Sequence, residues 1–155
     1  MSARTGAKRV RVASPFGPLV LTETGGFITR VSWGGEGADE TPLLLEAAVQ
    51  LEAYFAGRRR VFDLPFAFLP GLGGEVQQAM LAIPMGETRT YGDLSKALGA
   101  PAQAIGQACG SNPIPILIPC HRVLSATGLG GFSAPGGIET KVALLKHEGA
   151  ASLLI

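Results

Sequence analysis

The sequence has few of the residues that several protein classes depend on. Two cysteines in 155 residues, Cys109 and Cys120, are too few for a disulfide framework and fit a reducing compartment. Two histidines and the lack of any Cys-x-x-Cys pair argue against a structural zinc site, so we expect no metal. The formal net charge of +1 lacks the bulk basic signature of a nucleic-acid-binding protein. Any contact with DNA must therefore come from a few placed groups and helix ends.

Long apolar stretches are also missing. The basic N-terminus passes directly into an alternating pattern, with no apolar core of a secretion signal behind it. We therefore expect a cytoplasmic protein that has no membrane partner. Glycine and proline are plentiful instead, at 22 and 11 residues, and they predict many tight turns. A hydrophobic content of 46% is enough to form the core of one domain or of two small ones.

The first seventy residues predict a small antiparallel sheet with one helix. Gly25 and Gly26 form a hairpin signal, and Thr41 with Pro42 forms the N-cap and first position of a helix that ends at Gly57. The strand-like segments are residues 8–13, 19–22 and 27–33, followed by a returning strand over 58–62 and 64–68.

The remaining residues predict a mainly helical part. The Pro-Gly-Leu-Gly-Gly stretch of residues 70–74 is the best linker candidate, so we expect domains at 1–70 and 71–155. Thr90 and Asp93 have the spacing of a capping box. The expected helices are residues 75–83, 90–98, 101–109 and 138–148. The second and third have the make-up of a helix-turn-helix, although two helices around a glycine are common in any α-rich domain.

The central stretch runs from Ile114 to Val123. Its apolar part has the length of a strand and is expected to be buried, and Pro119 ends it. A thiol, an imidazole and a guanidinium follow at Cys120, His121 and Arg122, at the expected boundary of the core. A free cysteine most often packs as a small hydrophobic residue, but a neighbouring imidazole or cation can turn it into a nucleophile. The residues alone leave both interpretations open.

A family resemblance resolves this choice. The Ile-Pro-Cys-His-Arg-Val run of residues 118–123 follows Gly-Ser-Asn-Pro at 110–113 and precedes Gly136-Gly137, Lys141 and the His-Glu-Gly run of 147–149. In this setting the chain resembles the O⁶-alkylguanine-DNA alkyltransferases, also called methylated-DNA–protein-cysteine methyltransferases. The similarity also covers residues 14–19, 53–57 and 83–91.

The resemblance implies an α+β fold: an N-terminal ribonuclease-H-like domain with a small antiparallel sheet and a helix, and a helical C-terminal domain with a helix-turn-helix and the reactive cysteine. It implies a repair protein that moves an alkyl group from O6 of guanine, or O4 of thymine, onto its own Cys120 and is spent. His121 would act as the base through a water molecule, and Glu148 would orient it. No cofactor is implied, and the expected partner is alkylated DNA bound by a monomer.

Further roles follow from the same resemblance. Asn112 corresponds to the hinge asparagine, and Tyr91 to the phenol that meets guanine N3 and a phosphate, although without the resemblance the two residues read as an Asx turn and a helix cap. The damaged base must leave the stack to reach the thiol. The residues implied to line the base pocket are Tyr91, Val123, Phe132 and Ser133. Those implied to contact DNA are Thr90, Tyr91, Gly92, Gln103, Arg122 and Ala126.

One position departs from the family pattern. Gln103 stands where the recognition helix usually carries an arginine that replaces the flipped nucleotide, and the preceding turn is about two residues short. Glutamine brings neither the charge nor the stacking plane of a guanidinium. We therefore expect altered nucleotide flipping. The alternatives are a module that binds damaged DNA without reacting and, ranked lower, a cysteine hydrolase, for which the sequence shows no oxyanion hole.

Overall fold

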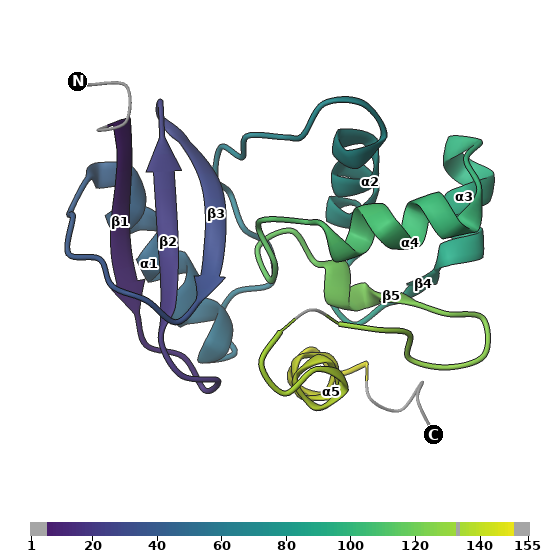
Figure 1. Cartoon of the computed structure of the whole chain (residues 1–155). Coiled ribbons are helices and arrows are strands. Elements are labelled where there is room, and N and C mark those ends of the chain that lie inside the picture. Colours follow the sequence, from purple (N-terminus) through teal and green to yellow (C-terminus); the bar gives the residue numbers. More distant parts are fainter. Residues whose placement is uncertain (1–5, 133, 151–155) are drawn as a thin grey trace. The chain divides into compact units, whose positions relative to one another are not determined.

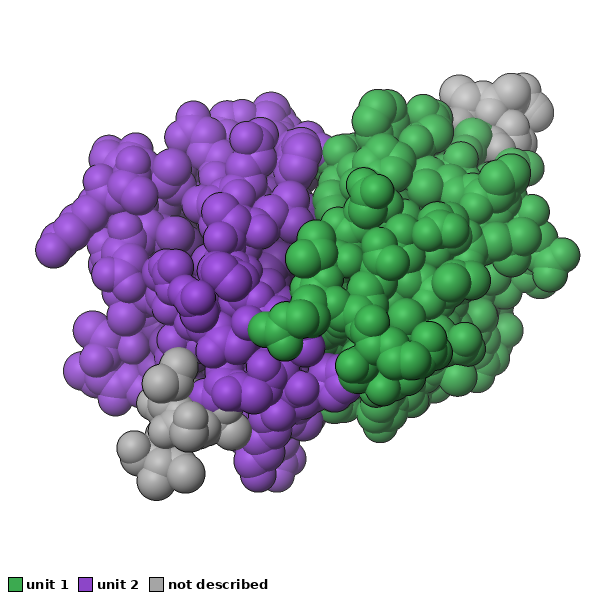
Figure 2. Space-filling view, turned by 180° about the vertical axis from the view of Figure 1, so that it is seen from behind, with its two compact units in different colours: residues 1–67 green, residues 68–155 purple. Residues whose placement is uncertain are grey.

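The computed structural model describes residues 6–132 and 134–150. The chain divides into two compact units, Met1–Ala67 and Phe68–Ile155, which are coloured separately in Figure 2.

Unit 1 is a three-stranded antiparallel sheet with a helix (Figure 1). Strands β1 (Ala7–Val12), β2 (Leu19–Thr24) and β3 (Phe27–Trp33) lie in the order β1-β2-β3. Gly25 and Gly26 join the last two strands with φ values of 61° and 85°, which a two-residue hairpin turn requires. Leu19 and Leu21 of the central strand are fully buried. The sheet predicted from the sequence is confirmed.

Helix α1 (Pro42–Phe55) starts where the sequence predicts. The hydroxyl of Thr41 accepts a hydrogen bond from the Leu44 amide at 3.0 Å, and proline occupies the first turn. Leu44, Leu51 and Tyr54 of this helix are completely buried in the core of unit 1.

The predicted returning strand over residues 58–68 is wrong. Of these residues only Phe66 forms a bridge, a single parallel one to Ile28. The buried Gln50 side chain binds the Asp63 backbone on both sides, accepting from its amide at 2.9 Å and donating to its carbonyl at 3.1 Å. At Asp63 a side chain therefore satisfies the backbone groups that a strand ladder would have used, and the backbone hydrogen bonds of this described segment to β3 are limited to those of Pro65 and Ala67, both with Ile28.

Unit 2 is mainly helical and carries a two-stranded parallel pair. Its elements are α2 (Gly71–Leu81), β4 (Arg89–Thr90), α3 (Tyr91–Leu98), α4 (Ala102–Gly110), the 3₁₀ helix η2 (Cys120–Arg122), β5 (Val123–Leu124) and α5 (Ile138–His147). Strand β4 pairs with β5, Arg89 opposite Val123 and Thr90 opposite Leu124. This pairing brings the start of α3 next to the segment that carries Cys120.

The capping box at α3 is confirmed. Thr90 Oγ1 accepts from the Asp93 amide at 3.0 Å, and the Asp93 carboxylate accepts from the Thr90 amide at 2.8 Å. Gly99 then ends α3 with a φ of 68°, and the chain turns into α4.

The linker expected at residues 70–74 is instead the start of α2. Pro70 is the N-cap, and the glycines form the first turn. A Cβ added to Gly74 would lie 2.0 Å from the Leu69 carbonyl oxygen. These glycines therefore allow close backbone packing at this point, which the sequence pattern could not distinguish from flexibility.

The apolar run before Cys120 is buried as expected, but it is not a strand. Ile114, Ile116 and Ile118 are 0% exposed, in a chain of consecutive turns. Ile116 has a φ of 70°, a conformation rare for a β-branched residue. A backbone folded back on itself buries side chains in several directions, whereas a strand would have alternated them between two faces.

Candidate active site

Cys120 lies where the buried turns end. Its amide donates to the Ile118 carbonyl at 2.8 Å and it begins η2 directly after the buried Pro119. Cys120 keeps part of its surface accessible, whereas the residues on both sides of it are buried. The thiol is thus held at the edge of a rigid, packed segment.

Asn112 ties the end of α4 to this segment. Its Nδ2 donates to the Ile118 carbonyl at 3.0 Å, and its Oδ1 accepts from the Ile114 amide at 3.1 Å and from Gln77 Nε2 at 3.2 Å. The same side chain lowers the pKa of the Cys120 thiol. One carboxamide therefore holds both ends of the turn that precedes the sulfur.

Opposing effects act on the Cys120 thiol. Burial raises its pKa, because a thiolate is costly away from water, while the Asn112 side chain and the positive charge of Lys141 lower it. The first effect prevails, so the pKa of Cys120 is raised. A thiol in this state needs a base to take its proton before it can act as a nucleophile.

The next residue in the chain, His121, is a buried imidazole that contacts a buried carboxylate. His121 is 0% exposed, and its Nε2 lies 2.7 Å from Glu148 Oε2. Burial would raise the pKa of Glu148, but hydrogen bonds from His121 and Arg122 and the positive charge of Arg122 outweigh it and hold the pKa at about 2. Glu148 is therefore a carboxylate at neutral pH.

This carboxylate sets the tautomer of His121. Burial, the largest effect, lowers the pKa of His121 and outweighs the opposing hydrogen bond and charge of Glu148, so the ring is neutral at neutral pH. A carboxylate can only accept, so the proton of the neutral ring must lie on Nε2. Nδ1 is then an acceptor, and it has no partner among residues 6–132 and 134–150. The neutral ring thus keeps one nitrogen that can accept a proton.

The structure corrects the expectation that Arg122 contacts DNA. Arg122 is only 6% exposed. Its Nε lies 2.8 Å from Glu148 Oε1 and its Nη2 lies 3.0 Å from Glu148 Oε2. Its Nη1 donates to the Ile83 carbonyl at 2.6 Å. The guanidinium thus donates its hydrogen bonds to groups inside unit 2, and it forms a bidentate pair with the carboxylate that also binds His121. It supports the site from within.

Lys141 of α5 is a completely buried cation that sequence reasoning noted only as part of a motif. Its Nζ donates to the carbonyls of Val123, Leu129 and Gly131 at 2.7, 2.5 and 3.2 Å. Desolvation lowers its pKa to about 8, so at neutral pH it keeps the three N–H donors that these carbonyls use. Lys141 thereby fixes the loop after Cys120 onto α5.

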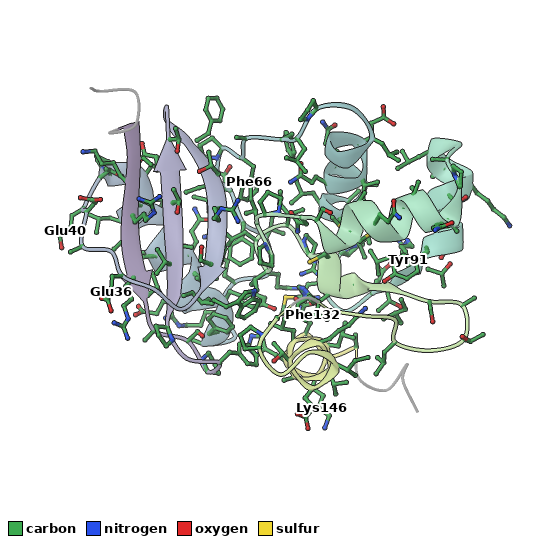
Figure 3. All side chains as sticks on the ribbon, in the orientation of Figure 1. Glu36, Glu40, Phe66, Tyr91, Phe132 and Lys146 are labelled. Carbon is green, nitrogen blue, oxygen red and sulfur yellow. The ribbon has the colours of Figure 1, made fainter. Side chains whose placement is uncertain are left out.

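The described residues expected to line a base pocket come from α3, β5 and the loop before α5. Tyr91 begins α3, and its hydroxyl would lie 2.9 Å from a Cβ placed on Gly130. The phenol therefore lies against the loop before α5. Figure 3 labels Tyr91 there and Phe132 in that loop. Val123 is fully buried, and its carbonyl is one of the three that Lys141 binds. Ser133 lies outside the described residues.

The residues expected to face DNA, apart from Arg122, are accessible. Gln103, in the first turn of α4, is exposed, as are Gly92 and Ala126. Thr90 is half-buried because its hydroxyl caps α3. The sequence analysis missed Gln77 altogether, since a lone glutamine in a helix gives no signal of burial or of its partners.

Comparisons with known proteins agree with this architecture. Residues 73–150 match the family model described as "6-O-methylguanine DNA methyltransferase, DNA binding domain", and residues 11–68 match its "ribonuclease-like domain". The chain therefore belongs to the 6-O-methylguanine DNA methyltransferase family.

Relatives from several organisms are similar over most of the chain. A methylated-DNA–protein-cysteine methyltransferase of Mycobacterium leprae is 40% identical, covering 92% of this chain and 94% of the relative. A constitutive one of Bacillus subtilis is 38% identical, covering 87% and 91%. The crystal structure of Mycobacterium tuberculosis OGT in complex with DNA is 38% identical with a TM-score of 0.79, covering 93% and 94%. No helix within residues 6–132 and 134–150 has the length and apolar character needed to cross a membrane.

Proposed function

We propose that this protein repairs DNA by transferring an alkyl group from O6 of guanine to Sγ of its own Cys120. The observation that carries the proposal is the buried ion-paired cluster of Glu148, His121 and Arg122, two of whose members directly follow the partly accessible Cys120 in the chain. The printed names of the relatives support it. The activity is that of a methylated-DNA–protein-cysteine methyltransferase acting once per molecule.

The reaction needs a proton acceptor, an attack and a leaving group. His121 Nδ1 takes the thiol proton through a water molecule, and Glu148 stabilises the imidazolium that results. The thiolate attacks the alkyl carbon, the S–C bond forms, and the C–O6 bond breaks with its electron pair left on the base. The guanine anion then takes up a proton, for which the Tyr91 hydroxyl is the proposed donor at N3. Burial raises the pKa of Tyr91, so its proton is retained until then.

DNA is the proposed partner, with the pair α3–α4 as its binding element. Gln103 on the exposed side of α4 would meet the orphaned base, and Thr90, Gly92 and Ala126 would lie at the backbone. We further propose the two domains 1–70, ribonuclease-H-like, and 71–155, DNA-binding, which the two family models and the two compact units support. The free cysteines support a reducing cytoplasmic location.

Mass spectrometry of the intact protein tests the proposal. After incubation with duplex DNA that carries O⁶-methylguanine, we expect one methyl group on the peptide that contains Cys120. The Cys120→Ala variant should bind the same duplex and gain no methyl group. The Cys109→Ala variant is the matched control, because Cys109 is buried with a pKa of about 12, and it should still be methylated. A folded wild-type protein that binds and never gains the methyl group would instead indicate a damage-binding module.

A further inference from the structure

Gln77 is a buried polar residue that the proposed reaction does not use. It lies in the second half of α2, is 0% exposed, and has both ends of its carboxamide engaged. Its Oε1 accepts from the Leu69 amide at 2.8 Å, and its Nε2 donates to Asn112 Oδ1 at 3.2 Å. A fully buried amide with both groups satisfied has one orientation, because turning it over would face donor to donor and acceptor to acceptor.

This orientation is passed on to Asn112. The Leu69 amide can only donate, so it selects the oxygen of Gln77 and directs the Gln77 nitrogen to Asn112. Asn112 must then offer Oδ1 to Gln77, which leaves its Nδ2 for the Ile118 carbonyl. That carbonyl also accepts from the Cys120 amide at 2.8 Å, so Asn112 and Cys120 share one acceptor. The Ile114 amide gives Oδ1 a second donor, so two donors together fix the Asn112 carboxamide.

We propose that Gln77 is a positioning residue for Cys120 and acts through Asn112. Without the Gln77 donor, Oδ1 of Asn112 keeps only the Ile114 amide, and the carboxamide gains freedom to rotate. Asn112 then holds the Ile118 carbonyl, to which the Cys120 amide also donates, less firmly, and its effect on the Cys120 thiol weakens. The thiolate loses part of the stabilisation that opposes its burial, and the fraction of reactive sulfur at neutral pH falls. The inference rests on the proposed function only in taking Cys120 as the reacting residue.

The test measures the reactivity of Cys120 against pH without DNA. Iodoacetamide alkylates the thiolate, and mass spectrometry of the Cys120 peptide separates this cysteine from Cys109. We expect Gln77→Met to raise the pKa read from this profile by about half a unit and to slow alkylation at neutral pH about threefold. The matched control is Gln50→Met, because Gln50 is likewise buried on a helix, binds a backbone amide and carbonyl of Asp63, and belongs to unit 1. A shift in Gln77→Met no larger than in Gln50→Met overturns the proposal.

Two further variants show whether the effect passes through Asn112. In an Asn112→Ala background, Gln77→Met should add no further shift, and a full additional shift would contradict the proposed route. Gln77→Leu removes the donor to Asn112 with a side chain of similar size that cannot ionise. It should shift the profile about as far as Gln77→Met, and it supplies the test if the methionine variant does not fold. A wild-type profile for Gln77→Leu would refute the role of the donor.

Failure of this inference differs from failure of the proposed function. The iodoacetamide profile needs no alkylated DNA, so it reports on Gln77 even if no methyl transfer occurs. Conversely, methyl transfer by the wild-type protein together with unshifted Gln77 variants would leave the repair function standing and remove only the role of Gln77.

Discussion

Replacing Glu148 by glutamine should destabilise unit 2 strongly. The change keeps the size of a side chain that binds His121 at 2.7 Å and Arg122 at 2.8 and 3.0 Å, all buried, and removes its charge. The Arg122 guanidinium would remain buried without its counter-charge. Breaking a buried pair in this way typically costs about 3–5 kcal/mol.

The pKa of Glu148 gives a second estimate. In the folded protein it is about 2, against 4.5 for an unperturbed carboxyl, and this difference corresponds to about 3 kcal/mol of folding free energy at neutral pH. A carboxyl whose pKa is lowered by folding contributes this stability above its unfolded value of 4.5, and loses it as the pH falls toward about 2. The wild-type protein and Glu148→Gln should therefore differ most near neutral pH and converge in acid.

Urea unfolding at several pH values measures this difference. Far-UV circular dichroism follows mainly unit 2, which has four of the five α-helices in the described residues, while fluorescence of Trp33, the one tryptophan, follows unit 1. The matched control is Glu36→Gln, because Glu36 pairs with Arg11 at 3.1 Å with side chains 87% and 46% exposed. An exposed pair contributes little, so this variant should unfold like the wild type. Equal losses in Glu148→Gln and Glu36→Gln, or a gap that persists down to pH 2, would refute the reasoning.

Two further predictions concern the turn before Cys120 and the DNA-facing side of α4. Ile116 has a φ of 70° and a fully buried side chain, so Ile116→Ala should cost about 2–4 kcal/mol, and Ile116→Gly should cost less than the alanine variant by about 1 kcal/mol, because glycine relieves the left-handed strain. The usual order, with alanine less harmful than glycine in urea unfolding, would show that the strain is absent. Gln103→Arg, at an exposed site, should speed methyl transfer from duplex DNA and leave the reaction with free O⁶-benzylguanine unchanged, since only the duplex substrate requires a base to be displaced. Equal acceleration on both substrates would contradict a role in nucleotide flipping.

Local signals in the sequence determined much of the fold. The Gly25-Gly26 hairpin, the Thr41-Pro42 helix start and the Thr90/Asp93 capping box were all predicted correctly. Each depends on backbone conformations and hydrogen bonds among residues within about four positions of one another. The motif around Cys120 likewise sufficed to predict the family, because that residue order is distinctive.

Contacts that local patterns do not encode decided the rest. Residues 58–68 formed one bridge instead of a strand, and Gln50 binds the Asp63 backbone there. Residues 70–74 joined a helix in which Gly74 lies against Leu69. Arg122 turned inward, because Glu148 lies 26 positions away in sequence and 2.8 Å away in space.

Chemically, the sequence alone determined which groups are available: a thiol, an imidazole, a carboxylate and two cations. Only the tertiary structure decided their states. Whether a group is charged, and which atom carries the proton, depends on burial and on partners that folding brings together from far along the chain. That dependence makes Glu148 an anion, leaves Nδ1 of His121 free to accept, and directs the Arg122 guanidinium into the protein.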